Sequence, residues 1–556
     1  MNLGRLWRTL RWLKAGQLWG RVRFRLVRPR PELAPPPPLR PAASGSTAAA
    51  WVVPAAREAS LSSPTRMRFL GVTHDLAEVG WDAPELPLLW RYNQHYFDDL
   101  NAADAAARRD WHRALVARWL DANPPGHGTA WAPYPVSLRI VNWIKWFLAG
   151  EPVPPDWQAS LAVQARWLTR RLEWHLLGNH LFVNAKALVY AGLFFDGPEA
   201  QQWLETGLRI LERELPEQIL TDGGQFERSP MYHALALEDV LDLLNLIGVR
   251  AAPASPSARL VPMLRRHAAG MLFWLRCLRH PDGALARFND TAEGIAPATD
   301  DIERYAAALG IEAAGAPSDG VHPLQPSGYV RATRGDALAL LDVAPIGPDY
   351  LPGHAHADTL SFELSVQGHE LVVNRGTSVY GDGPRRQVER GTAAHSTVQL
   401  GQHDSSEVWA GFRVGRRARP REVSVDGWSI SAAHDGYTHL PGRPLHRRRW
   451  HLEEHGLTVH DELAPAVAEP AVARYHLAPG LRCEPEADAD AEGSSRWRIW
   501  HDADPRAPLA TAHVRRGSGS LESWQHARRF GELVPATTLA VRLEAGAAEV
   551  HWTWHR

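Results

Sequence analysis

The chain has 556 residues, of which 45% are hydrophobic and 22% are charged, and its formal net charge is -1. This length predicts more than one domain, and the composition is that of a folded globular protein rather than a disordered one. A net charge near zero excludes a general attraction to nucleic acid, so charge-based binding must be local. The two cysteines, Cys277 and Cys483, lie far apart. A disulfide framework and a cysteine-rich zinc site are therefore excluded.

Residues 1–30 carry nine Lys or Arg side chains and no acidic one. These cations interrupt every apolar run, so we expect no cleavable signal peptide. A helical wheel places Arg5, Arg8 and Arg11 opposite one apolar side, which consists of Leu3, Leu6, Trp7, Leu10 and Leu13. The segment is predicted to be a basic amphipathic helix, which either lies on an anionic membrane surface or packs on the body of its own protein.

No run of about 18 apolar residues occurs, so no transmembrane helix is expected. We therefore expect a cytoplasmic protein. Peripheral membrane contact through residues 1–30 and a periplasmic location stay open as alternatives.

Periodicity divides the rest of the chain. Residues 31–66 include a Pro- and Ala-rich tract that cannot bury a core, and they are predicted to be a linker or a wrapping arm. From 67 to 315 apolar residues recur with the helical period. From 316 to 556 the period becomes two, in short segments separated by turn residues. The sequence thus predicts an α-helical domain followed by an antiparallel β-sandwich, with a site between them.

Polar side chains concentrate at the ends of these apolar segments, where binding and catalytic residues are often found. The clusters are GNHLFVNAKAL with Asn179 and His180, GGQFERSPMYH with Glu227, Arg228 and Tyr232, ARFND with Arg287 and Asn289, and GHAHADTLSF with His354, His356 and Asp358, followed by Asn374, Tyr380 and His395. Simpler alternatives exist, because Asn179 could be a helix cap and Tyr232 a core residue. If residues 353–362 form a strand, His354, His356 and Asp358 share one face.

In this order the clusters resemble the heparinase II/III family, which includes alginate lyase-like enzymes. The resemblance extends from about residue 67 to the middle of the β domain and rests on WRYNQHYFDDL, GNHLFVNAKAL, GGQFERSPMYH, GHAHADTLSFEL and RGTAAHSTV. The branch most similar is the one associated with bacterial surface-polysaccharide gene clusters. The resemblance implies an (α/α) toroid followed by an antiparallel β-sandwich. It also implies cleavage of a uronic-acid polysaccharide by β-elimination, linked to exopolysaccharide or capsule metabolism.

The resemblance also implies roles for individual residues. Asn179 and His180 would stabilise the charge that develops on the sugar carboxylate. Tyr232 would act as base, acid or both, and His354 as the second proton-transfer group. As a base, Tyr232 would need a cationic neighbour such as Arg228. The residues expected to contact the substrate are Glu227, Arg228, Arg287, Asn289 and Tyr380.

A structural zinc at the domain junction, held by His, Asp and His, is a further implication of the resemblance. The matching positions are His356, Asn374 and His395. Asn374 departs from the family pattern, since an amide oxygen is neutral and binds zinc more weakly than a carboxylate. We therefore expect zinc to be bound weakly, or a hydrogen-bond network in its place.

Two other functions stay open from the sequence. A glycoside hydrolase on the same scaffold would use carboxylates such as Asp222, Glu227 or Asp290. A glycan-binding or assembly protein would bind the polysaccharide without cleaving it. The sequence names neither the polysaccharide nor the oligomeric state.

Overall fold

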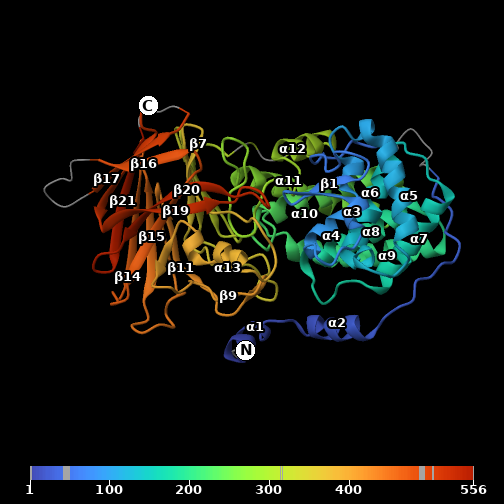
Figure 1. Cartoon of the computed structure of the whole chain (residues 1–556), viewed down its shortest axis with the longest axis horizontal. Helices are drawn as coiled ribbons and strands as arrows, with labels where there is room; N and C mark the ends of the chain where they lie inside the picture. Colours follow the sequence, from blue (N-terminus) through green and yellow to red (C-terminus); the bar gives the residue numbers. More distant parts are fainter. Residues whose placement is uncertain are drawn as a thin grey trace.

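A computed structural model describes residues 3–41, 50–312, 315, 317–486, 495–503 and 506–554. Figure 1 shows a helical domain at one end of the molecule and a β domain at the other, with the N-terminal helices outside both. The predicted order, an α-helical toroid followed by an antiparallel β-sandwich, is confirmed. Within the described residues, no helix combines the length and the apolarity needed to cross a bilayer.

The helical domain begins with a hairpin of β1 (Arg66–Phe69) and β2 (Val72–Asp75). Its helices are α3 (Leu76–Val79), α4 (Leu88–Gln94), α5 (Arg109–Ala122), α6 (Pro133–Leu148), α7 (Pro155–Arg170), α8 (Gly178–Phe194), α9 (Pro198–Gln218), α10 (Pro230–Arg250), α11 (Val261–Cys277) and α12 (Thr299–Ala308). In α8 every residue from Leu181 to Phe194 is buried. A helix that is apolar on all sides needs neighbours all round, and α8 packs against α6, α7, α9 and α10. The central position of α8 holds its first turn in place.

The segment before this domain lies along the surfaces of both domains. It contains α1 (Leu3–Leu10) and α2 (Ala15–Leu26), which Figure 1 shows at the edge of the molecule. Further on, Arg166 donates to the carbonyls of Ala34 (2.6 Å) and Pro35 (2.9 Å), and Leu39 forms a β-bridge with Phe195. Residues 31–41 are therefore a wrapping arm rather than a free linker.

In the described part of the chain, the β domain is built on two large antiparallel sheets, besides a small two-stranded sheet of β9 (Val408–Trp409) and β10 (Arg413–Val414). One has the order β19-β20-β15-β7-β6-β5-β4-β3, with β8 also on β15, where the strands are β3 (Gly320–Leu324), β4 (Tyr329–Arg334), β5 (Ala337–Asp342), β6 (Phe362–Val366), β7 (His369–Val373), β8 (Val398–Leu400), β15 (Ala471–Leu477), β19 (Ser518–His526) and β20 (Val534–Arg542). The other has the order β11-β12-β13-β14-β21-β18-β17-β16, where the strands are β11 (Pro420–Asp426), β12 (Ser429–His434), β13 (Leu445–Leu452), β14 (Gly456–Ala464), β16 (Leu481–Pro485), β17 (Ser495–His501), β18 (Ala510–Arg516) and β21 (Ala547–Trp554). Apolar side chains of both sheets, including Phe362, Trp450 and Trp552, form one core between them.

A few short elements lie outside the two sheets, namely α13 (Pro384–Arg390), β9 (Val408–Trp409) and β10 (Arg413–Val414). The strand considered for residues 353–362 does not form there, because β6 begins only at Phe362. The residues before it form turns: the N–H of Ser361 donates to the carbonyl of Asp358 (2.8 Å), and Leu360 has a φ of 66°. His354 and His356 therefore do not share a strand face.

Candidate active site

A cavity of about 1120 Å³ opens between the two domains. Its walls come from three parts of the chain. The helical domain contributes Asn179, His180, Glu227 and Tyr232, the β domain His354, Tyr380 and Phe412, and the N-terminal segment Leu6, Leu13 and Gln17. The structure thus brings together in one cavity the four residues to which the sequence analysis gave catalytic roles.

Tyr232 reaches the cavity from the first turn of α10. This helix begins at Ser229, whose Oγ accepts the N–H of Tyr232 (3.1 Å), and Pro230 follows at the first helical position, where proline is favoured. The Tyr232 hydroxyl lies 3.2 Å from that of Tyr380. Burial, followed by the neighbouring Tyr380, raises the pKa of Tyr232 well above its ordinary value of 10.0. The phenol therefore stays protonated at neutral pH, so it carries a proton and is a poor candidate for the base.

His354 stacks on Tyr232, and its orientation is set by Glu227. Its Nδ1 lies 2.6 Å from Oε2 of Glu227, a side chain that is 2% exposed. Because a carboxylate can only accept, Nδ1 carries the proton, and in the neutral imidazole Nε2 keeps a lone pair. Gln225 supports the carboxylate, since its Nε2 lies 3.3 Å from Oε1 of Glu227. Glu227, expected to contact the substrate, is instead the partner of His354.

Asn179 and His180 lie in the first turn of α8, at the wall of the cavity. The residues before them have positive φ, 63° at Leu177 and 53° at Gly178, and a Cβ on Gly178 would collide with Leu351. The cap position belongs to Leu177, so the helix-cap alternative for Asn179 is wrong. The positive end of the helix dipole adds to the attraction for an anion at this turn.

Glu173 controls the charge of His180. His180 Nδ1 lies 3.2 Å from Oε1 of Glu173, whose other oxygen accepts the amide of Asn184 (3.1 Å). Burial lowers the pKa of His180, but the charge and hydrogen bond of Glu173 outweigh it, so the net pKa is raised. The ring of Tyr134 packs on His180 with centroids 4.6 Å apart. Sequence analysis missed Glu173 and Tyr134, because both lie outside the motifs and follow no period shared with His180.

Three residues expected to contact the substrate lie outside the cavity walls. The Nε of Arg228 donates to the carbonyl of Ser327 (2.8 Å), so its guanidinium is used in a buried loop contact and does not activate Tyr232. Arg287 is paired with Glu370 (2.8 Å). Asn289 donates to the carbonyl of Arg228 (3.1 Å) and, through Oδ1, accepts the N–H of His356 (3.0 Å). These roles are corrected to structural ones. Tyr380, by contrast, does line the cavity.

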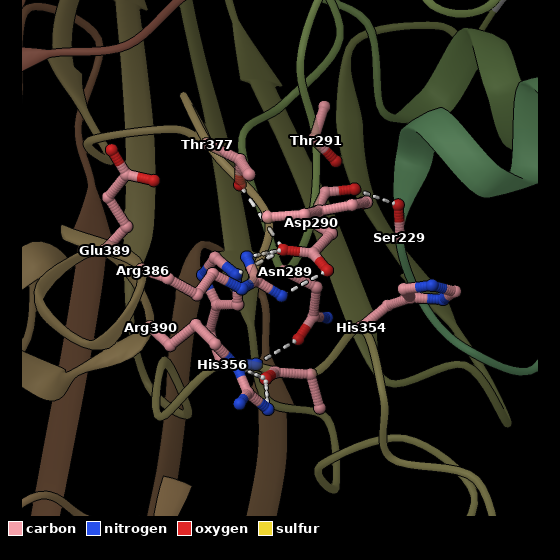
Figure 2. A network of polar contacts seen from close by, with 12 residues as sticks. Ser229, Asn289, Asp290, Thr291, His354, His356, Thr377, Arg386, Glu389 and Arg390 are labelled. Carbon is pink, nitrogen blue, oxygen red and sulfur yellow. Dashed lines mark hydrogen bonds and ion pairs between the residues drawn. The ribbon is translucent and has the colours of Figure 1, made fainter. Parts of the chain in front are cut away.

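Figure 2 shows the domain junction, where the carboxylate of Asp290 is the centre of a buried network and the ring of His354 lies apart from it. His356 Nε2 is 2.8 Å from Oδ1 of Asp290, and Arg386 binds both carboxylate oxygens, with 2.6 Å to Oδ2. Burial raises the pKa of Asp290, but the charge of Arg386 and the bonds from His356 and Arg386 hold it well below its usual range. Burial lowers the pKa of His356 to about 4, so this imidazole is neutral. Asp358, expected beside one of the histidines, instead accepts the N–H of Asn289 (2.9 Å).

The expected zinc ligands are only partly assembled here. Nδ1 of His356 and Nε2 of His395 lie 3.3 Å apart, a spacing that two ligands of one tetrahedral ion would have. The amide of Asn374 is used elsewhere: it donates to Glu363 (3.2 Å) and accepts the N–H of Ser396 (2.9 Å). Among the described residues, no group of three or more His, Cys, Asp or Glu side chains could hold a metal. Two neutral imidazoles do not complete a zinc site.

The carboxylates considered for hydrolysis do not converge. Asp222 accepts the N–H groups of Gly224 (3.0 Å) and Ser327 (2.9 Å), and Asp290 is bound in the junction. Of these carboxylates, Glu227 alone lines the cavity. A hydrolase built on Asp222, Glu227 and Asp290 is therefore not supported.

Comparison with known proteins agrees with this geometry. The family model "Heparinase II/III N-terminus" matches residues 95–306, and "Heparinase II/III-like, C-terminal" matches residues 316–553. The chain belongs to the heparinase II/III family. Among solved members of this fold, a structure of heparinase III superposes with a TM-score of 0.61 at 17% identity, covering 83% of this chain and 76% of that one. A mutant of heparan sulfate lyase HepC from Pedobacter heparinus gives a TM-score of 0.57 at 18% identity, covering 88% and 81%.

Curated relatives of this heparinase II/III protein match over shorter stretches. FtsZ-localized protein C of Caulobacter vibrioides is 28% identical over 399 residues, which is 66% of this chain and 64% of that protein. The heparin-sulfate lyase of Bacteroides stercoris is 34% identical over 127 residues, which is 21% of this chain and 18% of the lyase. The chain thus spans less than two thirds of the length of these relatives.

Proposed function

We propose that this protein is a polysaccharide lyase that cleaves a uronic-acid-containing polysaccharide by β-elimination. The observation that carries the proposal is the pair of Tyr232 and His354. A protonated phenol and an imidazole whose Nδ1 is held by Glu227 lie together in one cavity, and the first turn of α8 lines the same cavity. An acid, a base and an anion site are the three groups that elimination next to a carboxylate requires.

The proposed reaction assigns one proton transfer to each ring. His354 Nε2 removes the proton on C5 of the uronate, and the C–H electrons form the C4=C5 double bond. The bond from C4 to the glycosidic oxygen breaks, and the Tyr232 hydroxyl gives its proton to that oxygen. Glu227 stabilises the imidazolium that forms at His354, because the carboxylate already accepts its Nδ1–H (2.6 Å).

Asn179 and His180 supply the anion site. Removal of the C5 proton shifts negative charge onto the sugar carboxylate, and preorganised donors at that point lower the barrier. The raised pKa of His180 favours its cationic form, which strengthens this contact. With Arg228 and Arg287 paired elsewhere, these two residues are the donors that we assign to the carboxylate.

A direct assay tests the reaction class. Elimination creates a C4=C5 double bond conjugated to the carboxylate, which absorbs ultraviolet light, whereas hydrolysis creates none. We expect the purified chain to raise ultraviolet absorbance on at least one member of a panel of uronate polysaccharides. New reducing ends without that absorbance would contradict the lyase assignment.

For the substrate, we propose a bacterial exopolysaccharide or capsule that contains uronic acid. The support is the likeness of WRYNQHYFDDL and of the stretch after Gly391 to the branch linked with surface-polysaccharide gene clusters. The panel should therefore include the surface polysaccharide of the source bacterium beside heparan sulfate and alginate.

A second candidate is a glycan-binding assembly protein without lyase activity. The match to FtsZ-localized protein C, over more of the chain than the heparin-sulfate lyases cover, favours it. The same panel separates the two candidates, because this one predicts saturable glycan binding with no unsaturated product.

A further inference from the structure

The N-terminal strap, defined here as Leu3–Arg30, spans the two domains. In α1, Arg5 (3.1 Å) and Arg8 (2.8 Å) pair with Glu407 of the β domain. In α2, the ring of Phe24 lies 4.2 Å from that of His175 in the helical domain. Figure 1 shows both helices on the outside of the molecule, along the lower edge of the view. The strap is therefore docked on the protein at both ends.

The first helix of the strap is docked by its polar side. Besides the pairs with Glu407, Thr9 accepts the indole N–H of Trp409 (3.1 Å). The apolar residues Leu3, Trp7 and Leu10, spaced to share one face of a helix, are 41 to 75% exposed. A surface helix normally buries its apolar side and exposes its charges. The reverse arrangement in α1 leaves an apolar face without cover.

The second helix repeats the pattern. Its inner side is narrow, with Gln17 and Gly20 buried, and a Cβ on Gly20 would lie 2.9 Å from the backbone of His175. Its outer side carries Leu18, Trp19, Val22 and Leu26, which are 47 to 77% exposed. At 3.6 residues per turn, Arg23 and Arg25 fall on either edge of this apolar row. Both helices thus expose leucine and tryptophan, and arginines border the row on α2.

The charges of the strap indicate which kind of partner would cover its exposed apolar face. Arg5, Arg8 and Lys14 are paired with Glu407 and Glu217. Of the remaining cations of the strap, Arg21 lines the cavity, and the others are exposed and are Arg11, Arg23, Arg25, Arg28 and Arg30. A partner must therefore be apolar and negatively charged over the same area. Amphipathic helices with tryptophan and leucine on one face and arginine beside them meet this condition at anionic bilayers.

We propose that the outer face of the N-terminal strap docks on the surface of an anionic lipid bilayer. The side chains that enter the headgroup region are Leu3, Trp7, Leu18, Trp19, Val22 and Leu26, whereas Leu10 also lines the cavity. The exposed arginines pair with lipid phosphates. Because Leu13 and Gln17 of the same strap line the cavity, docking holds the cavity beside the bilayer. This inference does not depend on the proposed reaction.

Vesicle co-sedimentation of the full chain tests the proposal. We expect binding to phosphatidylcholine vesicles that contain phosphatidylglycerol, and at least tenfold weaker partitioning onto phosphatidylcholine alone. Trp7→Ser with Trp19→Ser, and separately Arg23→Glu with Arg25→Glu, should each lower partitioning onto the anionic vesicles at least tenfold. As matched controls, Val423→Ser on an exposed strand and Arg443→Glu with Arg449→Glu in the β domain should leave it unchanged.

The variants are expected to fold, because α1 has no buried side chain and the substituted residues are exposed. Equal circular dichroism spectra and unfolding temperatures would show this. Three results would overturn the proposal: no binding to anionic vesicles, equal binding to both vesicle types, or full binding by the double tryptophan variant. Self-association that disappears in that variant, with no vesicle binding, would make the face an interface between two copies.

Discussion

The imidazole of His354 lies face to face on the phenol ring of Tyr232, with ring centroids 3.7 Å apart and planes 15° from parallel. The two residues come from different domains and are held by separate partners, His354 by Glu227 and Tyr232 by the first turn of α10. In the proposed reaction, this stacking lets the base and the acid act on neighbouring atoms of one sugar linkage.

Tyr232→Phe removes a hydroxyl and leaves the stacked ring in place. On a substrate that the wild type cleaves, we expect kcat to fall by at least about 10²-fold with substrate binding retained, because proton donation to the leaving oxygen is lost. Initial rates of ultraviolet absorbance and a separate binding measurement check this. Tyr437→Phe, which removes a hydroxyl bonded to the carbonyl of Val398 in the β domain, is the control and should keep its kcat. An unchanged rate in Tyr232→Phe would remove this residue from the reaction.

Glu227→Gln tests whether the carboxylate sets the protonation of His354. An amide cannot stabilise the imidazolium by charge, so we expect kcat to fall by about 10²-fold or more while KM changes little. Adding Glu227→Gln to His354→Ala should cost little more, since the carboxylate acts through the imidazole. Glu205→Gln, an exposed helix residue, is the matched control. If the fold losses in kcat of the two single variants multiply in the double variant, Glu227 has a role separate from His354.

The raised pKa of His180 predicts how substrate affinity depends on pH. This pKa is raised above the ordinary 6.5, so the cation that attracts the substrate carboxylate is the major form at pH 6.5 and is lost as pH rises through the raised pKa. We expect KM for a uronate polysaccharide to increase as pH rises above 6.5. In His180→Gln the KM should be higher at low pH and nearly flat over the same range. Parallel KM profiles in both proteins would show that another group titrates.

Asp290→Asn tests how much the buried ion pair of Asp290 and Arg386 contributes to the free energy of unfolding. The change leaves Arg386 buried and without its full counter-charge, which typically costs about 3–5 kcal/mol in the free energy of unfolding. Asp300→Asn breaks a pair with Arg279 in which the carboxylate is 74% exposed, and should cost about 1 kcal/mol or less. Urea unfolding of both variants gives the comparison. Equal losses in the free energy of unfolding would show that the buried pair contributes no more to stability than the exposed pair.

Zinc binding is predicted to be weak. The His356 and His395 nitrogens are close enough to share an ion, but the position of the third ligand holds Asn374, which is neutral and already hydrogen-bonded. Metal analysis after dialysis should find much less than one zinc per chain. Asn374→Asp should raise zinc retention, because a carboxylate restores the missing charge. Stoichiometric zinc in the wild type would contradict this account.

Periodicity predicted the domain order, and the resemblance to the heparinase II/III family predicted the four residues that meet at the cavity. They could not pair His354 with Glu227, which lie 127 positions apart in the chain and share no pattern. Arg228 and Arg287 were misjudged for a physical reason. The sequence alone does not distinguish an arginine that makes a buried structural contact from one that binds a substrate, because the distinction depends on the neighbours in the folded chain.

The false strand at residues 353–361 has a similar cause. Alternation of polar and small residues in GHAHAD imitates a strand, but the turn at Asp358 and the positive φ of Leu360 redirect the chain before β6. The sequence predicts one basic amphipathic helix within residues 1–30, whereas the structure has two helices there, α1 and α2. Only the tertiary structure shows that α1 meets the protein with its charged side, since Glu407 is distant in sequence.

The buried contact of Asp290 with Arg386 joins the two domains, because Asp290 lies in the loop between α11 and α12 and Arg386 on α13 of the β domain. Rotating the domains apart would separate two opposite charges with no water to replace their bonds. Opening the cleft by such a rotation would therefore cost the free energy of this buried pair. In the proposed reaction, a polysaccharide that slides lengthwise into the cleft avoids that cost, so the thickness and branching of the sugar chain would decide which polymers reach Tyr232 and His354.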